Sequence, residues 1–265
     1  MKQVHANDVE RPNQPGRSTG ERPSLATTRL WLFGGLGEEE RTALEAACSD
    51  VRAIEGKQDL VKERASTGVV HLLLEGWACR YKLTGNGSRQ IPTLLLPGDI
   101  CDIDAILFDR LDYGVATLTP CRVAVLPRAR VLELSARYPR IGAALWWLTM
   151  VENSTLTEWV LCLGRRSADQ HLAHLFCELL VRLAAVGMAE NNGYALPLTQ
   201  EQLADALGLT SVHVNRTLQQ LRKAGLVELD RGRLRILEWE AIKRRAGFDP
   251  AYLRPEGLRR SPMAA

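Results

Sequence analysis

The residues most suited to chemistry in this 265-residue chain are concentrated between Thr199 and Arg222. Thr199 and Gln202 have the spacing of a capping box, in which two side chains satisfy backbone N–H groups at the start of a helix. Gly208 can take the left-handed conformation that ends such a helix, and Thr210 can cap a second one. A helix, a short turn and a second helix form the arrangement that presents the second helix to the major groove of DNA.

The predicted second helix carries side chains that could contact base edges. Its segment from Ser211 to Lys223 contains no acidic residue, which suits contact with a polyanion. Arg216 can donate two hydrogen bonds to guanine. The other residues of this motif that we expect to contact bases or phosphates are Thr199, Thr210, Ser211, Val212, His213, Asn215 and Gln219. The alternative is a solvated surface helix, but a generic helical hairpin does not usually combine two caps, a glycine and an acid-free face.

Downstream, residues 225–236 predict a β-hairpin that turns at residues 230–232. Arg231 and Arg233 would lie at its tip, beside a phosphate backbone. Upstream, the spacing of leucines from Ala168 to Val186 predicts another helix. Residues 168–253 are therefore expected to form a winged helix-turn-helix domain.

A long helix must precede this domain. Between residues 139 and 163, side chains recur at steps of three and four residues, which is the spacing of a coiled-coil seam. The predicted seam comprises Ile141, Leu145, Leu148, Thr155 and Trp159, and Glu152 interrupts it. We expect residues 136–167 to form a dimerisation helix and a hinge, with a break at Gly164. A helix packed against its own domain is the alternative.

The N-terminal half has the pattern of a β domain. Short strand-like runs at 69–74, 77–83, 91–96 and 117–126 are separated by turns. They predict an antiparallel sandwich or barrel over residues 29–135. Residues 1–28 are too polar and too rich in proline and glycine to bury much surface, so we expect a disordered tail, and residues 254–265 form a C-terminal tail.

Composition bears on the partners and the cellular compartment of the protein. The net charge of +3 permits a nucleic-acid partner without arguing for one. No apolar stretch approaches the length of a membrane span, and the N-terminus lacks the apolar core of a signal peptide, so we expect a cytoplasmic protein with reduced cysteines.

His171, His174 and Cys177 share a helix face and could form a corner of a metal site. Side chains packed between helices are favoured instead, because no fourth ligand is visible.

Taken together, the chain resembles the Crp/Fnr family of bacterial transcription regulators over about residues 30–253. The phrases that carry the resemblance are Leu74-Glu75-Gly76-Trp77, Gly87-Ser88-Arg89-Gln90-Ile91, Leu96-Pro97-Gly98-Asp99 and residues 198–218. It implies an α+β protein with an N-terminal antiparallel, jelly-roll-like β-roll of the cyclic-nucleotide-binding type, which would serve as the sensor domain. It also implies a parallel homodimer along the long helix, a pseudo-palindromic DNA site and RNA polymerase as a partner.

The resemblance also bears on the DNA sequence that is recognised. Recognition helices of this family usually carry a glutamate at the position of Val212 and an arginine at that of Arg216. Arg216 matches, so its base-contacting role carries over. Val212 departs, and an apolar side chain would favour a thymine methyl over a cytosine amino group.

The effector is unknown from the sequence. Members that bind cyclic AMP hold its phosphate with an Arg-Ser or Arg-Thr pair. The corresponding region here is about Arg110-Leu111-Asp112, and Asp112 would repel a phosphate, although Arg110 could serve if the loop shifted by one residue. The candidate effector pocket therefore comprises Gly98, Asp99 and Arg110.

Metal cofactors find less support. Oxygen-sensing members hold an iron–sulfur cluster through clustered N-terminal cysteines, whereas the first cysteine here is Cys48 and stands alone. Haem-binding members use a cysteine close to the position of Cys101, but isolated cysteines are more often small buried side chains.

The leading hypothesis is a homodimeric, sequence-specific transcription regulator. The alternative is a sensor of a small molecule, for example a cyclic nucleotide, with weak DNA function. A nucleotide in the β domain without DNA sequence preference would favour it. An enzyme is not favoured, because the sequence shows no Ser-His-Asp or Cys-His set, phosphate loop or metal motif.

Overall fold

The computed structural model describes residues 36–254. Within that range the chain forms two compact units, residues 36–153 and residues 154–254. The predicted tail at 1–28 and most of the predicted C-terminal tail lie outside the described residues. Between residues 36 and 254, no helix is long and apolar enough to cross a membrane.

The first unit contains two antiparallel sheets. Its strands are β1 (Val51–Ile54), β2 (Asp59–Val61), β3 (Val69–Glu75), β4 (Ala78–Leu83), β5 (Arg89–Leu95), β6 (Gly114–Thr117) and β7 (Cys121–Pro127), with a 3₁₀ helix η1 (Ile103–Ile106) before β6. The sheet orders are β1-β7-β3 and β2-β6-β4-β5. One buried apolar core takes side chains from both sheets, among them Leu73 and Val115. The predicted antiparallel β domain is confirmed.

One predicted strand is wrong. The run 117–126 is divided between two strands, since β6 ends at Thr117 and β7 begins at Cys121. Pro120 has no N–H to donate to a ladder, which favours a corner there. The corner is fixed by side chains, because the Thr117 hydroxyl donates to the Glu55 carbonyl oxygen at 2.7 Å.

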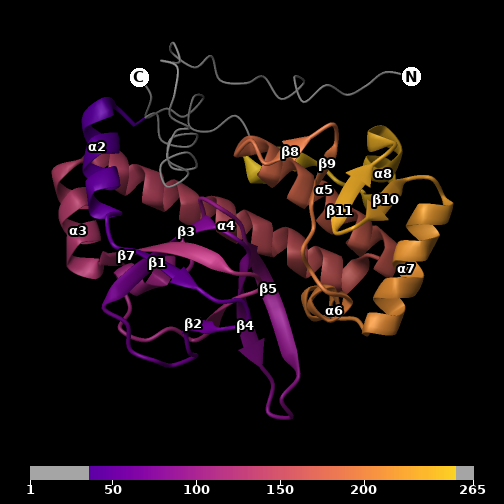
Figure 1. Cartoon of the computed structure of the whole chain (residues 1–265), viewed down its shortest axis with the longest axis horizontal. Helices are drawn as coiled ribbons and strands as arrows, with labels where there is room; N and C mark the ends of the chain where they lie inside the picture. Colours follow the sequence, from indigo (N-terminus) through magenta and orange to yellow (C-terminus); the bar gives the residue numbers. More distant parts are fainter. Residues whose placement is uncertain (1–35, 255–265) are drawn as a thin grey trace. The chain divides into compact units, whose positions relative to one another are not determined.

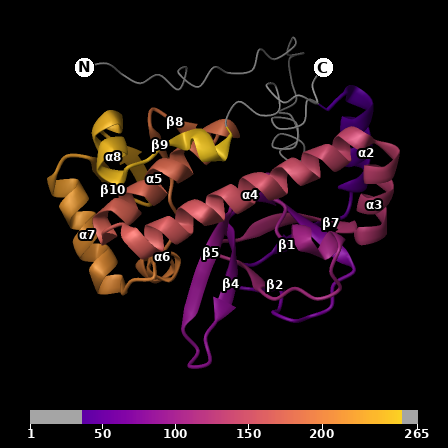
Figure 2. The same cartoon turned by 180° about the vertical axis from the view of Figure 1, so that it is seen from behind.

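Three helices pack at one end of this unit. They are α2 (Glu38–Ala47), α3 (Arg128–Arg137) and the first part of α4 (Pro139–Arg165). A second apolar core consists of Leu36, Leu44, Leu134, Ile141 and Ala144. Figures 1 and 2 show α2 and α3 beside the N-terminal end of α4. Apolar packing therefore fixes the start of α4 to the first unit.

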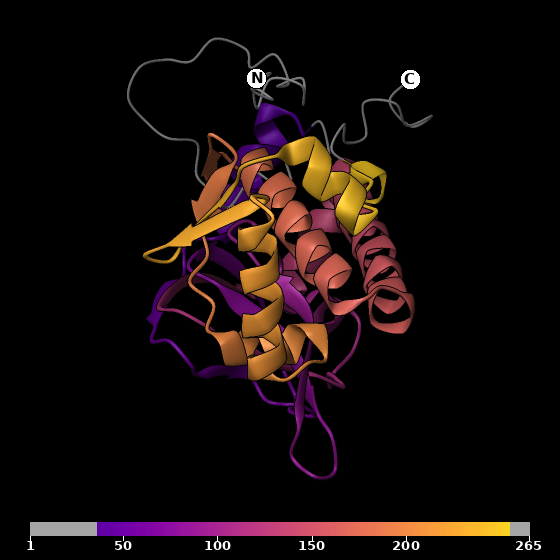
Figure 3. The same ribbon diagram turned by 90° about the vertical axis from the view of Figure 1, so that its right-hand side faces the viewer.

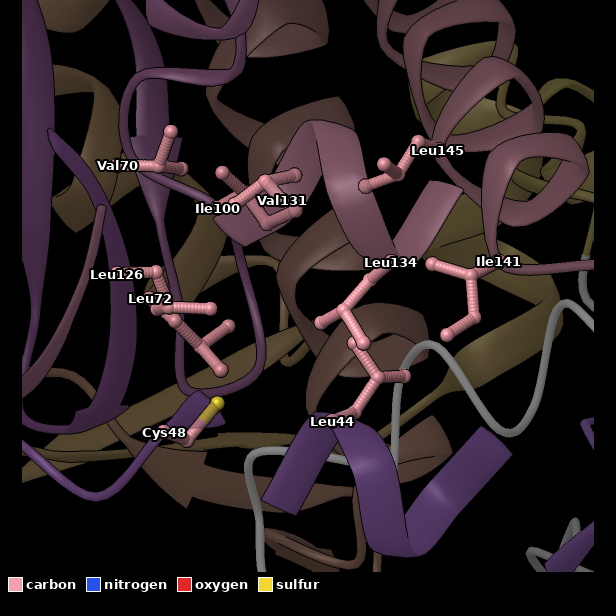
Figure 4. A pocket seen from close by; sticks show the side chains of 10 residues that line it. All are labelled: Leu44, Cys48, Val70, Leu72, Ile100, Leu126, Val131, Leu134, Ile141 and Leu145. Carbon is pink, nitrogen blue, oxygen red and sulfur yellow. The ribbon is translucent and has the colours of Figure 1, made fainter. Parts of the chain in front are cut away.

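A small cavity of about 30 Å³ lies in the first unit, lined by residues of both cores (Figure 4). Its lining is apolar apart from the thiol of Cys48, and burial raises the pKa of that thiol to about 11. The volume is about that of one water molecule, and a water there would find few hydrogen-bond partners. The cavity is a packing gap rather than a site for a nucleotide.

The second unit is built around α5. Its elements are α5 (Ala168–Ala185), β8 (Ala189–Glu190), β9 (Gly193–Ala195), α6 (Gln200–Leu207), α7 (Ser211–Lys223), β10 (Val227–Asp230), β11 (Arg233–Ile236), α8 (Trp239–Ala246) and the 3₁₀ helix η2 (Pro250–Leu253). The strands form one sheet in the order β10-β11-β9-β8. Residues 171–180 of α5 are all buried, so this helix is the core on which the other elements pack.

The end of α4 differs from its prediction. Gly164 does not break the helix, which continues to Arg165. The chain is held there by Arg166, which donates to the Glu158 carboxylate at 3.1 Å and to the Gly247 carbonyl oxygen at 3.0 Å. Ser167 then begins α5 with a capping box. The two units divide inside α4, at residues 153 and 154, rather than at the turn after it.

Candidate nucleic-acid interface

The helix-turn-helix begins and ends at the predicted residues. The Thr199 hydroxyl accepts from the Gln202 N–H at 3.1 Å, and Gln202 Oε1 accepts from the Thr199 N–H at 2.9 Å. Gly208 ends α6 in the left-handed conformation, with φ 65° and ψ 34°. The Thr210 hydroxyl then accepts from the His213 N–H at 3.2 Å and caps α7. These caps fix the direction in which α7 leaves the turn.

The predicted buried faces of both helices are confirmed. They comprise Leu203, Ala204 and Leu207 on α6 and Val214, Leu218 and Leu221 on α7. Thr217 and Gln202 are also buried. A helix packed along one whole side in this way presents a defined opposite stripe to solvent.

That opposite stripe carries the predicted contact residues. Val212 is 78% exposed, and Ser211, Arg216 and Gln219 are exposed as well. His213 and Asn215 are half-buried. Ser211, Val212, Asn215 and Arg216 together line an open depression with a fifth residue, Gln200 of α6.

Gln200 belongs to this surface although the sequence does not predict it. Its Oε1 accepts a hydrogen bond from Asn215 Nδ2 at 3.2 Å, which joins the first turn of α6 to the middle of α7. The two residues are fifteen positions apart. The one available signal is that Gln200 directly follows the cap Thr199 and therefore lies at the start of α6.

The predicted wing hairpin is confirmed as a structure. Strands β10 and β11 pair up to Asp230 and Arg233, which leaves Arg231 and Gly232 in a two-residue turn. Their φ angles are 46° and 75°, as a hairpin turn that follows the strand twist requires. Arg231 and Arg233 are exposed at the tip, and Figure 3 shows the hairpin beside α7.

Two members of the predicted dimer seam are buried within their own unit, and the other three are half-buried. Ile141 is 1% exposed in the second apolar core. Trp159 is 5% exposed, and its Nε1 donates to the buried Glu178 carboxylate at 2.9 Å. The other three members, Leu145, Leu148 and Thr155, are half-buried. On this face the alternative interpretation, a helix packed against its own chain, describes α4.

The opposite face of α4 carries a second repeat. Trp146 is 69% exposed, Met150 52% and Val160 69%. Asn153 and Thr157 are exposed between them. The five residues follow at steps of four, three, four and three, so they form one stripe along the helix. We call these five residues the exposed α4 stripe.

Glu152, which interrupts the predicted seam, has a partner within the first unit. Its carboxylate forms an ion pair with Arg80 of β4, which is 6% exposed. Arg80 Nε also donates to the Cys101 carbonyl oxygen at 2.7 Å, and its guanidinium lies 5.0 Å from the centre of the Tyr113 ring. This buried cluster joins β4 to α4. A charged residue in an apolar strand is the only sequence signal for it.

The residues of the candidate effector pocket lie in the turn after β5 and in the loop before β6. The Asp99 carboxylate accepts from the Leu96 N–H at 2.8 Å, and Gly98, with φ 93°, donates to the Leu73 carbonyl oxygen at 2.8 Å. These two residues therefore shape the turn after β5. Arg110 is exposed on the loop before β6. An effector pocket formed by these residues stays a prediction.

Two basic side chains of the first unit are already paired with carboxylates. Asp112 lies beside Lys82, with 3.3 Å between its carboxylate and the ammonium nitrogen. The buried guanidinium of Arg80 is already neutralised by Glu152.

His171, His174 and Cys177 are packing residues of the second unit. The His174 ring stacks on Tyr252 with 5.8 Å between ring centres and meets the Phe248 ring edge-on at 5.1 Å. Burial lowers the pKa of His174 to about 4. In the described part of the chain, no group of three or more His, Cys, Asp or Glu side chains is arranged to hold a metal ion.

Comparisons with known proteins find a matching family model for the N-terminal part of the chain and another for the C-terminal part. Residues 170–245 match the family model of the Crp-like helix-turn-helix domain, and residues 51–138 match that of the cyclic nucleotide-binding domain. The transcriptional activator protein FnrL of Cereibacter sphaeroides is 30% identical over 182 residues, which cover 68% of this chain and 73% of the relative.

Two further similarities agree with these. The nitrogen fixation regulation protein FixK of Bradyrhizobium diazoefficiens is 30% identical over 184 residues, which cover 68% of this chain and 75% of the relative. The solved structure of FixK2 from Bradyrhizobium japonicum superposes with a TM-score of 0.67 at 22% identity, covering 73% of this chain and 95% of that one. The latter likeness concerns the fold.

Proposed function

The chain belongs to the Crp/Fnr family of DNA-binding transcription regulators, and from this premise we propose that it acts as a homodimer on a pseudo-palindromic DNA site. The observation that carries the proposal is the exposed stripe of α7, where Val212, Asn215 and Arg216 surround one depression. The family consists of transcription regulators rather than enzymes.

Helix α7 enters the major groove in this proposal. Arg216 donates to guanine, and Val212 packs against a thymine methyl. The polar residues around the two helix starts, Thr199, Thr210, Ser211 and His213, contact bases or phosphates, and Gln219 extends the stripe. Support comes from the caps, which hold both helix starts in place, and from the acid-free surface.

The wing supplies contacts that do not depend on sequence. Arg231 and Arg233 are exposed on a tight turn, so their guanidinium groups can lie along a phosphate backbone. Each phosphate that is neutralised releases counterions, so affinity falls as salt rises. Arg235 is ion-paired with Glu228 at 2.6 Å, which makes it a poorer phosphate ligand.

Dimerisation uses the exposed α4 stripe in place of the seam that the sequence predicts. Large apolar side chains such as Trp146 and Val160 are seldom left in water along a repeat of this spacing. A second copy of the same helix offers the matching repeat, and two-fold symmetry makes the interface self-complementary. Polar residues in such a seam, here Asn153 and Thr157, help to fix its register.

The first unit acts as the sensor domain in this proposal, and it signals through α4. Its match to the cyclic nucleotide-binding domain supports that role, while the Arg80–Glu152 pair argues against a cyclic phosphate as the effector. RNA polymerase is the expected partner at promoters. Since a regulator must meet chromosomal DNA, we place its action in the cytoplasm.

Arg216→Ala tests the reading of DNA. A preferred site is first selected from a random DNA pool with the wild-type protein. The substitution should cost about 1–3 kcal/mol of binding free energy at that site and much less on random DNA. Arg222→Ala, an exposed arginine later on the same helix, is the matched control and should retain base preference. Equal losses on both DNAs would remove the base-contacting role of Arg216, and no preferred site for the wild-type protein would refute the proposal.

A further inference from the structure

We propose that Gln200 is a specificity-determining residue, which acts by orienting the amide of Asn215 toward an adenine in the major groove. The inference rests on the proposed function, since it concerns how the same surface recognises DNA. It begins from the hydrogen bond between Asn215 Nδ2 and Gln200 Oε1, which spans 3.2 Å between two helices.

The side-chain amide of Asn215 has two N–H donors and one oxygen acceptor, and one of the N–H groups is used here. Asn215 Nδ2 carries two N–H groups, of which one is donated to Gln200. The other N–H and the Oδ1 atom remain as a neighbouring donor and acceptor. Adenine presents the complementary pair in the major groove, with N7 as acceptor and the N6 amino group as donor, and asparagine binds it in this two-pronged way.

The position of the two residues supports this role. Asn215 lies one helical turn after Ser211 and directly before Arg216, on the side of α7 that borders the depression. Gln200 is exposed at the first position of α6, and the capping box beside it holds that turn in place. An asparagine side chain on an exposed helix otherwise samples several rotamers. A fixed acceptor from the neighbouring helix therefore reduces the entropy that is lost on binding a base.

The two amides also complement the arginine. Arg216 recognises guanine, and its neighbour Asn215 would recognise adenine at an adjoining base pair. Gln200 retains its own Nε2 group, which can donate to a nearby phosphate. Loss of Gln200 therefore has two separable consequences, a loss of base preference through Asn215 and a loss of affinity through the phosphate.

A set of four variants distinguishes these consequences. Binding of the wild-type protein, Gln200→Ala, Asn215→Ala and the double variant is measured on the selected site and on versions with each base pair changed in turn. Asn215→Ala should flatten the preference at one A·T pair, with a loss of about 10-fold at the selected site. Gln200→Ala should flatten the preference at that same pair. The double variant should show no further loss of preference there, because both residues act on one contact.

Two further variants provide controls. Gln200→Glu keeps an oxygen that accepts from Asn215 but adds a negative charge, so it should retain the preference at that pair while overall affinity falls. Gln220→Ala, an exposed glutamine on α7 outside the depression, should change neither. Each variant is full-length and unfolds at the wild-type temperature if the change is local.

The inference is overturned if Gln200→Ala lowers affinity equally on every DNA while the preference at all base pairs persists. It is also overturned if the preference that Asn215→Ala removes is not for adenine. A wild-type protein without any base preference would instead refute the proposed function, so the two failures can be told apart.

Discussion

At the scale of a single residue, we expect Val212 to set the base preference of α7. Its side chain is 78% exposed on the stripe that faces the depression, and an apolar group there gains most when a partner covers it. A thymine methyl can do so, whereas a cytosine amino group needs an acceptor that valine lacks. Val212→Glu should therefore shift the preferred base at one pair of each half-site from thymine to cytosine. The change is measured by repeating the DNA selection with the variant.

The control for this shift in base preference keeps a β-branched apolar side chain at position 212. Val212→Ile keeps the apolar contact and should retain the thymine preference. A glutamate variant whose affinity falls on all DNAs, without any exchange of the preferred base, would show that Val212 lies beside a phosphate instead.

Local chemistry explains which site residues can be predicted from sequence. The capping box of Thr199, the left-handed Gly208 and the cap at Thr210 depend on neighbours within three or four positions, so residue types at those spacings suffice. The contact between Gln200 and Asn215 and the pair of Arg80 with Glu152 depend on how separate elements pack. A single sequence does not specify such distances.

At the scale of elements, α4 shows that one period can describe two faces of the same helix. Steps of three and four residues occur on both sides of this helix, once through the buried Ile141 and Trp159 and once through the exposed Trp146 and Val160. Periodicity identifies a helix with two apolar faces, but it does not say which face is covered by its own chain. Packing determines which face is covered. Glu152 lies on the covered face, because its carboxylate forms an ion pair with Arg80.

The packing of α4 on α5 also predicts a pH dependence. Burial lowers the pKa of His174 to about 4, while Arg166 lowers it further and Glu158, 3.6 Å away, raises it. The buried His171 has a pKa near 4 as well, lowered by burial and by His174. Both rings are thus favoured in the neutral form when the chain is folded, and the unfolded chain binds more protons below its ordinary histidine pKa of about 6.5.

Stability is therefore complete above about pH 6.5 and falls as the pH drops from there to about 4. Each histidine contributes at most about 1.4 kcal/mol per pH unit in that window. His174→Phe keeps a ring between Phe248 and Tyr252 but removes one titrating group. Denaturant unfolding from pH 7 to pH 4.5 should show a shallower decline for this variant. An unchanged slope would mean that other groups cause the decline.

At the scale of the whole molecule, α4 is the element that both units share. The first unit holds it through Ile141 and Glu152, and the second holds it through Trp159 and Glu158. The exposed α4 stripe runs across the boundary at residues 153 and 154. In the proposed dimer, α4 would therefore link dimerisation to DNA binding, because the same helix continues from the first unit into the second.

Trp146→Glu tests that link, because a carboxylate at the first position of the apolar stripe would stand against its own copy across the two-fold axis. We expect the variant to be a monomer by light scattering at concentrations where the wild-type protein is a dimer. Its affinity for the complete palindromic site should fall by at least about 100-fold, since two tethered half-site contacts become one. Its affinity for a single half-site should stay close to that of the wild-type protein, because α7 is untouched. Met188→Glu, the same kind of change at an exposed apolar residue outside α4, should leave both affinities and the dimer intact. A dimeric Trp146→Glu variant would place the partner on another surface.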